Sequence, residues 1–350
     1  MNRRLAILHL ATALLTLLAL FGCANDREFP LDGNFTAYSL SVSSNAPQVT
    51  MVTVTIENDE IVGYELDVRQ GQRTSTVDDQ GTVELEDDVT TYQFAWKEQT
   101  KLELGFEYKM HYRTYMASLL EAELATMEGY LNWLSENNQL EWHQQAELIE
   151  VFWLNEGVTN VQIDEEGNHL NVAGVSVSDQ GYTDLAKEAI ELAKAGKFQA
   201  FVCSGTDFYF AEMTMNGTEI VSLSIDVWQA NASATEGSFS WKEMSKRQLG
   251  YHYKMHYNSY VASLDNVETA TLEGYQGWLF ENNRLEWFEQ VDLVTAYVIA
   301  NGWDENLQSI SGRGVSLDGV TALDGTSGVT VKTDTYNELL GLLFGQVDEE

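Results

Sequence analysis

The chain has 350 residues, of which 44% are hydrophobic and 11% aromatic, so it can build packed cores and is not a disordered protein. Its 54 acidic and 19 basic residues give a net charge of −35, which excludes nucleic-acid binding and a position flat on anionic lipid. The acidic residues are scattered along the chain. This favours a soluble or halophilic surface over the steering of cationic partners, although both explanations stay open.

Residues 1–22 have the layout of a secretory signal peptide. Arg3 and Arg4 precede a largely apolar run, free of Asp, Glu, Lys and Arg, to Phe21, and Cys23 follows in the segment "LFGC". This segment resembles the bacterial lipobox, which implies cleavage before Cys23, acylation of its side chain (palmitate among the acyl groups) and a lipidated tether over residues 23–31. The alternative is a retained signal-anchor helix. Either way, the body of the protein is expected at the cell membrane, on its extracytoplasmic face.

The chain has two cysteines, and this number limits its redox chemistry. If Cys23 carries lipid, Cys203 has no partner for an intramolecular disulfide. A CxxC redox pair and a cysteine-ligated metal cluster are also excluded. We expect Cys203 to be a small buried apolar residue, and any redox chemistry then requires a bound cofactor.

The chain is an internal duplication. Residues 94–148 and 239–293 are identical at 32 of 55 positions without a gap. Two copies are too few for a solenoid, so the repeat indicates two tandem homologous domains. We place copy one at residues 32–196 and copy two at residues 197–346.

Each copy is predicted to contain the same elements in the same order. A first strand leads into a hairpin of alternating strands, whose turn is "ENDE" in copy one and "NGTE" in copy two. A helical block follows, which Gly157 or Gly302 ends. Its apolar residues have helical spacing and are Trp142, Ala146, Ile149 and Trp153 in copy one, and Trp287, Val291, Val294 and Val298 in copy two.

The end of each copy is predicted to hold a short strand, "GVSV" or "GVTV", and a final helix. The helix "TDLAKEAIELAKAG" ends at Gly196, and "TYNELLGLLFG" closes copy two with a capping box from Thr335 to Glu338. The predicted fold class is therefore α+β, with an antiparallel sheet and packed helices in each copy.

The order "K-x-x-LG-x-x-Y-x-M … EW-x-x-Q … GVTV … Y-x-x-L" resembles the FMN-binding domain family. That family occurs in subunits of sodium-pumping NADH–quinone reductases and in flavin lipoproteins of bacterial extracellular electron transfer. The segment "DGTSGVT" matches its flavin-attachment motif except at Val329, where alanine is usual. The resemblance implies that a flavin transferase moves FMN from FAD onto Thr330 as a phosphoester. Asp324 would serve recognition or turn geometry, and the small residues Ser327 and Gly328 would allow close approach.

Copy one departs from this motif. Its segment "LNVAGVSV" has Leu170 in place of the aspartate, Ala173 in place of the serine and Ser176 as the acceptor. We expect Ser176 to be a minor flavin site or none, so copy one is either a weak flavin binder or a retained scaffold.

The repeated "YKMHY" segments place one histidine in each copy, His111 and His256. One histidine from each repeated segment is poor spacing for a metal site, so no metal is expected and helix packing is favoured. If these segments border the flavin, their tyrosine and methionine side chains would stack on its ring.

These features predict an electron carrier rather than an enzyme. Covalent FMN would take electrons from a membrane NADH or quinone redox partner and pass them to an extracellular acceptor. The alternative is a non-redox binding or adhesion lipoprotein on the same scaffold. A third possibility is an FMN-dependent oxidoreductase acting on a small substrate.

Overall fold

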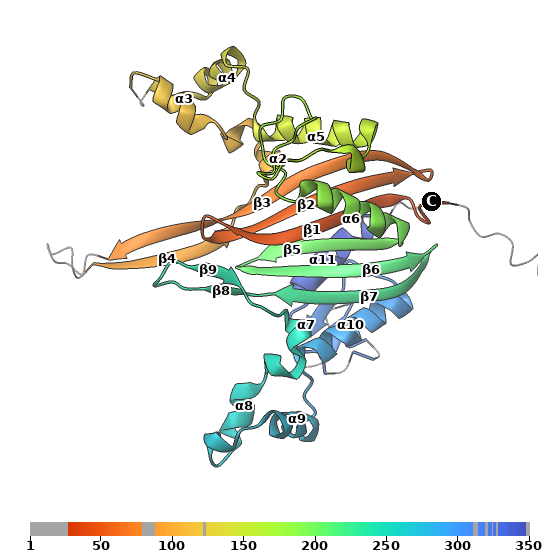
Figure 1. The fold of residues 1–350 in the computed structure, drawn as a ribbon. Helices are drawn as coiled ribbons and strands as arrows, with labels where there is room; N and C mark the ends of the chain where they lie inside the picture. Colours follow the sequence, from red (N-terminus) through yellow and green to blue (C-terminus); the bar gives the residue numbers. More distant parts are fainter. Residues whose placement is uncertain are drawn as a thin grey trace, which may run out of the picture.

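The computed structural model describes residues 27–78, 88–121, 124–310, 314–318, 321–323, 325–326 and 328–347. Cys23 and the segment predicted to be a signal peptide lie outside the described residues. The described part has antiparallel sheets with packed helices, which confirms the predicted α+β class (Figure 1). None of its helices is long and apolar enough to span a bilayer.

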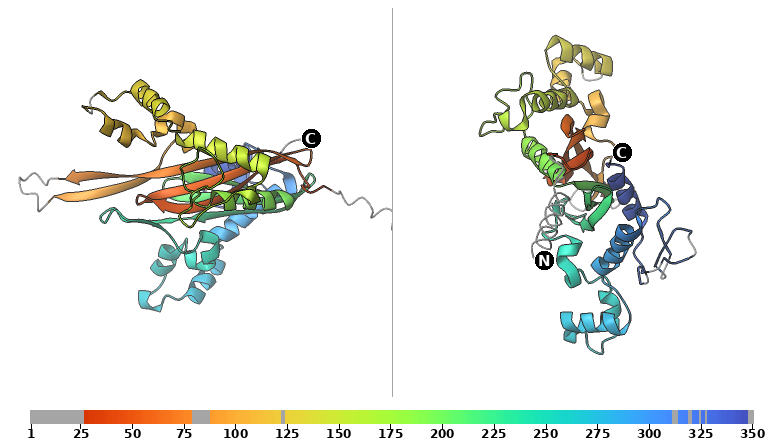
Figure 2. Two further views of the ribbon diagram at one scale, coloured as in Figure 1. Left: turned by 45° about the horizontal axis from the view of Figure 1, so that its top comes forward. Right: turned by 90° about the vertical axis from the view of Figure 1, so that its right-hand side faces the viewer.

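Copy one is built on a four-stranded antiparallel sheet in the order β1-β2-β3-β4. The predicted hairpin turn is present, because Asn58 and Asp59 both have left-handed backbone angles (φ 53° and 69°) between β2 and β3. The second half of β3 pairs with β4 and extends as an arm (Figure 2). The strands are β1 (Gly33–Ser43), β2 (Ala46–Glu57), β3 (Glu60–Asp78) and β4 (Val89–Trp96).

Copy two repeats the sheet with three strands, β5-β6-β7, and has two separate two-stranded sheets, β8-β9 and β10-β11, among its described residues. Its predicted turn also forms, with Gly217 at φ 57° between β6 and β7. The strands are β5 (Lys197–Ser204), β6 (Asp207–Asn216), β7 (Glu219–Trp228), β8 (Ala230–Ala232), β9 (Phe239–Trp241), β10 (Gln308–Ile310) and β11 (Gly314–Ser316).

The helices follow the predicted spacing. The four apolar residues predicted for each block are all buried, and Gly157 and Gly302, with positive φ angles of 89° and 81°, end these helices. In copy one the helices are α2 (Lys101–Leu104), η2 (Gly105–Tyr108), α3 (Tyr112–Ser118), α4 (Met127–Glu136), α5 (Trp142–Glu156), η4 (Val158–Asn160) and α6 (Tyr182–Lys194). In copy two they are α7 (Lys246–Leu249), η5 (Gly250–Tyr253), α8 (Tyr257–Ala262), η6 (Val267–Thr269), α9 (Leu272–Glu281), α10 (Trp287–Asn301) and α11 (Asp334–Phe344).

Two small helical lobes project on opposite sides of the sheets (Figures 1 and 2). One is formed by α3 and α4 and the other by α8 and α9. Each lobe has a small apolar cluster of its own, separate from the main core. The buried members are Tyr115, Tyr130 and Leu134 in one lobe and Tyr260, Tyr275 and Leu279 in the other.

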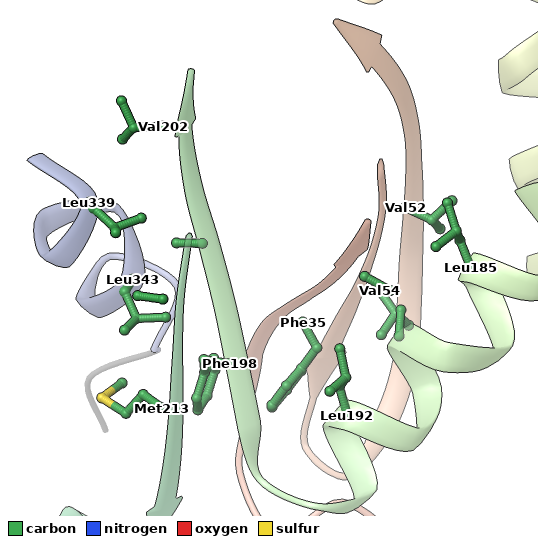
Figure 3. Close-up of a cluster of buried hydrophobic side chains, with 14 of the residues drawn as sticks. Phe35, Val52, Val54, Leu185, Leu192, Phe198, Val202, Met213, Leu339 and Leu343 are labelled. Atoms are coloured by element: carbon green, nitrogen blue, oxygen red, sulfur yellow. The ribbon is translucent and has the colours of Figure 1, made fainter. Parts of the chain in front are cut away.

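The two copies meet through equivalent residues. The edge strands β1 and β5 lie side by side, and the rings of Phe35 and Phe198 stack with centroids 4.4 Å apart. Trp96 and Trp241, which are also equivalent in the repeat, stack at 6.0 Å. Helix α6 covers β1 and β2, and helix α11 covers β5 and β6, so that one continuous apolar core runs through both copies (Figure 3). The contact is therefore self-complementary, as in a two-fold symmetric dimer.

Two predictions about the ends of the copies are wrong. The segments "GVSV" and "GVTV" are irregular rather than strands, because a glutamine side chain takes the backbone hydrogen bonds that a neighbouring strand would take. The capping box of Thr335 and Glu338 does not form either. Helix α11 begins at Asp334, so Thr335 lies inside the helix and Thr333 holds the N-cap position without a capping hydrogen bond.

Candidate functional site

Thr330 is held by the buried side chain of Gln290 on α10. The backbone N–H groups of Thr330 and Val331 donate to Gln290 Oε1 at 2.7 and 3.1 Å. The Thr330 hydroxyl donates to the same oxygen at 3.1 Å. One amide oxygen thus fixes the backbone on both sides of the hydroxyl, and we call this arrangement the glutamine clamp.

The clamp is itself held in place from the start of α10. Gln290 is 1% exposed, and its amide nitrogen donates to the Leu285 carbonyl at 2.9 Å and contacts Met255 Sδ at 3.5 Å. These contacts fix which way the amide faces, so that its oxygen points to the turn. Gly328 precedes the clamp with φ 95°, and a Cβ there would approach Leu285 to 3.0 Å, so this position needs glycine.

The hydroxyls of this turn have different surroundings. Thr326 is fully buried, and its Oγ1 donates to the Leu323 carbonyl at 2.8 Å and accepts from the Val315 amide at 3.1 Å. Thr330 is half-buried and is therefore less enclosed than Thr326. The hydroxyl of Thr326 supports the turn, whereas the hydroxyl of Thr330 bonds only to the clamp oxygen among the described residues. Asp324 and Ser327 lie outside the described residues.

Copy one has the same clamp around Ser176. Gln145 Oε1 accepts from the backbone amides of Ser176 and Val177 at 2.6 and 3.0 Å and from the Ser176 hydroxyl at 3.2 Å. Gly174 has φ 86°, matching Gly328. Ser176 is exposed. The geometry of the acceptor is therefore the same in both copies, and the copies differ in the residues around it.

A buried glutamate starts the helix that carries each clamp. Glu286 is 0% exposed; its carboxylate accepts from the Met255 and Trp287 amides at 3.0 and 2.9 Å and from the Tyr275 hydroxyl. Burial and this bond to Glu286 raise the pKa of Tyr275, so the phenol remains a donor. Glu141 has the same role in copy one. Each glutamate thus fixes a projecting lobe to the helix beside the clamp.

A lysine in an aromatic cage lies beside the helix that carries the clamp: Lys246 is on α7, and Trp287 of its cage lies three residues before Gln290 on α10. The ammonium group of Lys246 lies 5.2 Å from the ring of Tyr253, 5.5 Å from Trp287 and 5.9 Å from Tyr209. It makes no hydrogen bond or ion pair with any described residue, and burial lowers its pKa. The Trp287 indole donates to the Tyr336 hydroxyl at 2.9 Å, which ties the cage to α11. Attraction to the ring faces offsets part of the lost hydration of the cation.

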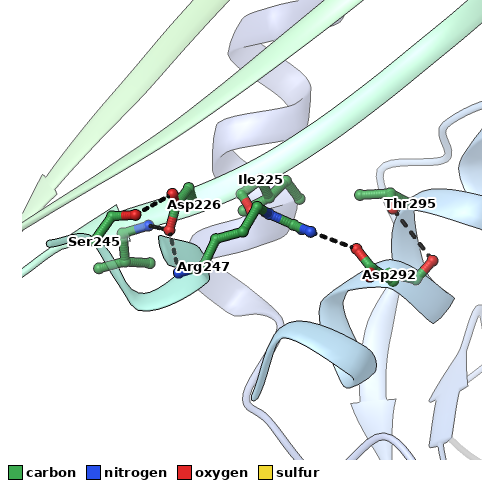
Figure 4. Close-up of polar contacts among 7 residues, drawn as sticks. Ile225, Asp226, Ser245, Arg247, Asp292 and Thr295 are labelled. Carbon is green, nitrogen blue, oxygen red and sulfur yellow. Dashed lines mark hydrogen bonds and ion pairs between the residues drawn. The ribbon is translucent and has the colours of Figure 1, made fainter. Parts of the chain in front are cut away.

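A polar network holds the turn that carries this lysine (Figure 4). The buried carboxylate of Asp226 accepts from the Ser245 hydroxyl and from the Arg247 amide, the latter at 2.9 Å. The Arg247 guanidinium donates to the Ile225 carbonyl at 3.0 and 3.1 Å and to Asp292 on α10 at 2.7 Å. Strand β7, helix α7 and helix α10 are therefore linked on either side of Lys246.

The remaining predicted residues have structural surroundings. His111 and His256 precede α3 and α8, and Nε2 of each lies 3.1 Å from a backbone carbonyl, of Leu140 and Leu285 respectively. The described residues contain no cluster of three or more His, Cys, Asp or Glu suited to a metal ion. Cys203 is half-buried rather than fully buried as expected. Its partial burial raises the pKa of the thiol to about 12, so at neutral pH it is not a thiolate nucleophile.

The comparisons with known proteins do not identify a family. No family model matches the chain. No curated protein matches it either. One solved structure, a solution NMR structure of a protein from Clostridium thermocellum, shares 18% identity over 46% of this chain and 91% of that protein, with a TM-score of 0.24.

Sequence reasoning did not assign roles to the clamp glutamines, the buried glutamates or the caged lysines. All of them are identical between the copies, in "EW-x-x-Q" for Glu286 and Gln290 and in "K-x-x-LG" for Lys246. Their identity in both copies, within segments that place apolar residues at core positions, is the signal that points to them. A buried polar side chain needs partners, and the sequence does not show where those partners lie.

Proposed function

We propose that the protein is an extracytoplasmic, membrane-anchored electron carrier with FMN esterified to Thr330. The observation that carries this proposal is the glutamine clamp around a half-buried hydroxyl at the residue where "DGTSGVT" ends. The neighbouring hydroxyl of Thr326 is fully buried and bonded, and it is a poor acceptor for that reason.

The clamp fits a residue that carries a bulky ester. When Thr330 Oγ bonds to the phosphorus of the FMN half of FAD, the P–O–P bond breaks, AMP leaves and the hydroxyl proton goes to solvent or to a base of the flavin transferase. Thr330 then loses its hydroxyl hydrogen bond to Gln290. The two backbone amides keep theirs, so the same turn geometry is held before and after modification.

The charge near the acceptor differs between the copies. Lys332, two residues after Thr330, is exposed and has no ion pair with a described residue, so its ammonium group can neutralise the negative charge of a phosphoester. The equivalent residue of copy one is Ser178. Together with Leu170 in place of Asp324, this difference supports copy two as the flavin carrier.

Bound FMN would supply one- and two-electron chemistry, which none of the side chains described here supplies. The protein would hold it at a solvent-accessible turn, where a membrane redox partner and an extracellular acceptor can both approach. Lys246 of α7 lies against Trp287, three residues before Gln290 on α10, and its positive charge would favour electron uptake by a nearby flavin.

The experiment is co-expression with a flavin transferase, followed by denaturation and in-gel flavin fluorescence. Wild type is expected to fluoresce, Thr330→Ala to lose the signal and Ser176→Ala, its matched variant in copy one, to keep it. Full fluorescence in Thr330→Ala would refute the assignment, and loss of signal only when Ser176 is also removed would make copy one the carrier. Absence of flavin in all forms would favour the non-redox binding protein.

The membrane anchor is tested separately. Cys23→Ala removes the acyl acceptor, so the protein is expected to be released from the membrane or left unprocessed. Membrane association with wild-type electrophoretic mobility would contradict the lipoprotein assignment.

A further inference from the structure

Copy one has a groove that the proposed function does not use. It has a volume of about 680 Å³ and lies between the β2–β3 turn, the end of α5 and the outer side of α6. Its apolar lining includes Phe29, Ile61, Tyr64, Trp153 and Ile190. Sites for small organic molecules commonly have this size and an aromatic lining.

Two hydrogen-bond donors of the groove have no acceptor among the described residues. The Tyr64 hydroxyl makes no hydrogen bond with them, and burial raises its pKa to about 12, so it keeps its proton. Trp153 is 1% exposed, and its indole N–H is buried without a partner. The two rings lie 5.6 Å apart, edge to face. Tyr64 is half-buried and lines the groove, so its hydroxyl can donate to a ligand that brings an acceptor atom.

The rim of the groove is negatively charged. It has four carboxylates (Glu28, Asp59, Glu60 and Glu191) and two ammonium groups (Lys187 and Lys194), which gives 2 − 4 = −2. Arg27, 3.9 Å from Asp59, offsets one of these charges and leaves the rim negative. Phosphate-bearing or carboxylate ligands are therefore disfavoured, and FMN belongs to the disfavoured class.

Copy two lacks both the donors and the space. Leu223 and Val298 stand at the positions of Tyr64 and Trp153. At the positions of Val158 and Ile190, copy two has Trp303 and Phe344, whose rings stack 5.8 Å apart. Gly341 replaces Lys187, and a Cβ there would approach the Trp303 ring to 3.2 Å. Since the copies share one fold, the open groove of copy one results from these substitutions and is not a necessary feature of the fold.

We infer that this groove binds a neutral, planar aromatic molecule with a carbonyl oxygen. The carbonyl accepts from the Tyr64 hydroxyl, and the aromatic ring lies on the apolar lining formed by Ile61, Trp153 and Ile190. The inference does not depend on flavin at Thr330, because the groove lies in copy one and the clamp of copy two takes no part in it.

The test uses the full chain and coumarin, an unreactive planar aromatic carbonyl compound, with binding measured by saturation-transfer NMR and titration calorimetry. Wild type is expected to bind coumarin with a Kd of about 0.1–1 mM, as suits a ligand of this size. Tyr64→Phe is expected to weaken binding about tenfold, the effect of one lost hydrogen bond. Tyr251→Phe removes a hydroxyl that bonds to Glu289 in copy two, and it is expected to leave binding unchanged.

A second variant tests the space itself. The triple change Val158→Trp, Lys187→Gly and Ile190→Phe transfers the residues that fill copy two, and it is expected to abolish coumarin binding while circular dichroism shows a folded protein. No binding by wild type at 1 mM coumarin, or undiminished binding by the folded triple variant, would overturn the inference. Equal or tighter binding of coumarin-3-carboxylate would overturn the assigned ligand class.

Discussion

The glutamine clamp makes a prediction that can be worked out from its contacts. Gln290→Ala removes the acceptor of two backbone amides and of the Thr330 hydroxyl, and it removes the donor to the Leu285 carbonyl. Three of these bonds have a backbone partner: the two amides and the Leu285 carbonyl. At about 1 kcal/mol each, their loss amounts to about 3 kcal/mol. Water entering the vacated space would reduce this loss, so we expect a decrease of about 2–3 kcal/mol in the free energy of unfolding.

The assay is urea unfolding followed by circular dichroism, combined with hydrogen exchange at the Val331 amide. Gln145→Ala is the matched control, since it breaks the same contacts in copy one. Both variants are expected to lose similar stability, but only Gln290→Ala should expose the Val331 amide and lower flavin loading at Thr330. A Gln290→Ala protein with an unfolding free energy within about 0.5 kcal/mol of wild type and unchanged exchange at Val331 would refute the clamp.

Three further predictions concern the core, a caged lysine and the free cysteine. Phe198→Ala is expected to lower the free energy of unfolding by about 3–5 kcal/mol. Because the ring belongs to the core that both copies share, calorimetry should show one unfolding transition for the whole protein, shifted to lower temperature. Two separate transitions would contradict this. Lys101 is the copy-one counterpart of Lys246; its ammonium group lies 5.0 Å from the rings of Tyr108 and Trp142, and burial lowers its pKa to about 8. Between pH 8 and 10.5 the folded state therefore binds fewer protons than the unfolded state, so the free energy of unfolding should rise by about 3 kcal/mol relative to Lys101→Met. Urea unfolding at each pH measures this rise, and a difference that stays constant with pH would refute it. Cys203 should react with a thiol reagent at pH 8 only after denaturation, and rapid labelling of the folded Cys23→Ser protein would show that the thiol is accessible.

Local sequence was sufficient for much of the fold. The turn "ENDE" places Asn58 and Asp59 where left-handed angles are needed, and these residue types tolerate such angles. The spacing of apolar residues before Gly157 predicted helix α5 and its buried face correctly. In each case the deciding interaction lies within a few residues of the signal.

The tertiary structure decided the features that depend on distant partners. Alternation in "GVTV" is compatible with a strand, but the backbone amides of Thr330 and Val331 bond to Gln290, 40 and 41 residues earlier in the chain. The stacking of Phe35 on Phe198 likewise depends on how two edge strands meet. A residue pattern records which side chains are apolar and which carry donors or acceptors. It does not record which of them the folded chain brings together, because that is fixed by packing over the whole molecule.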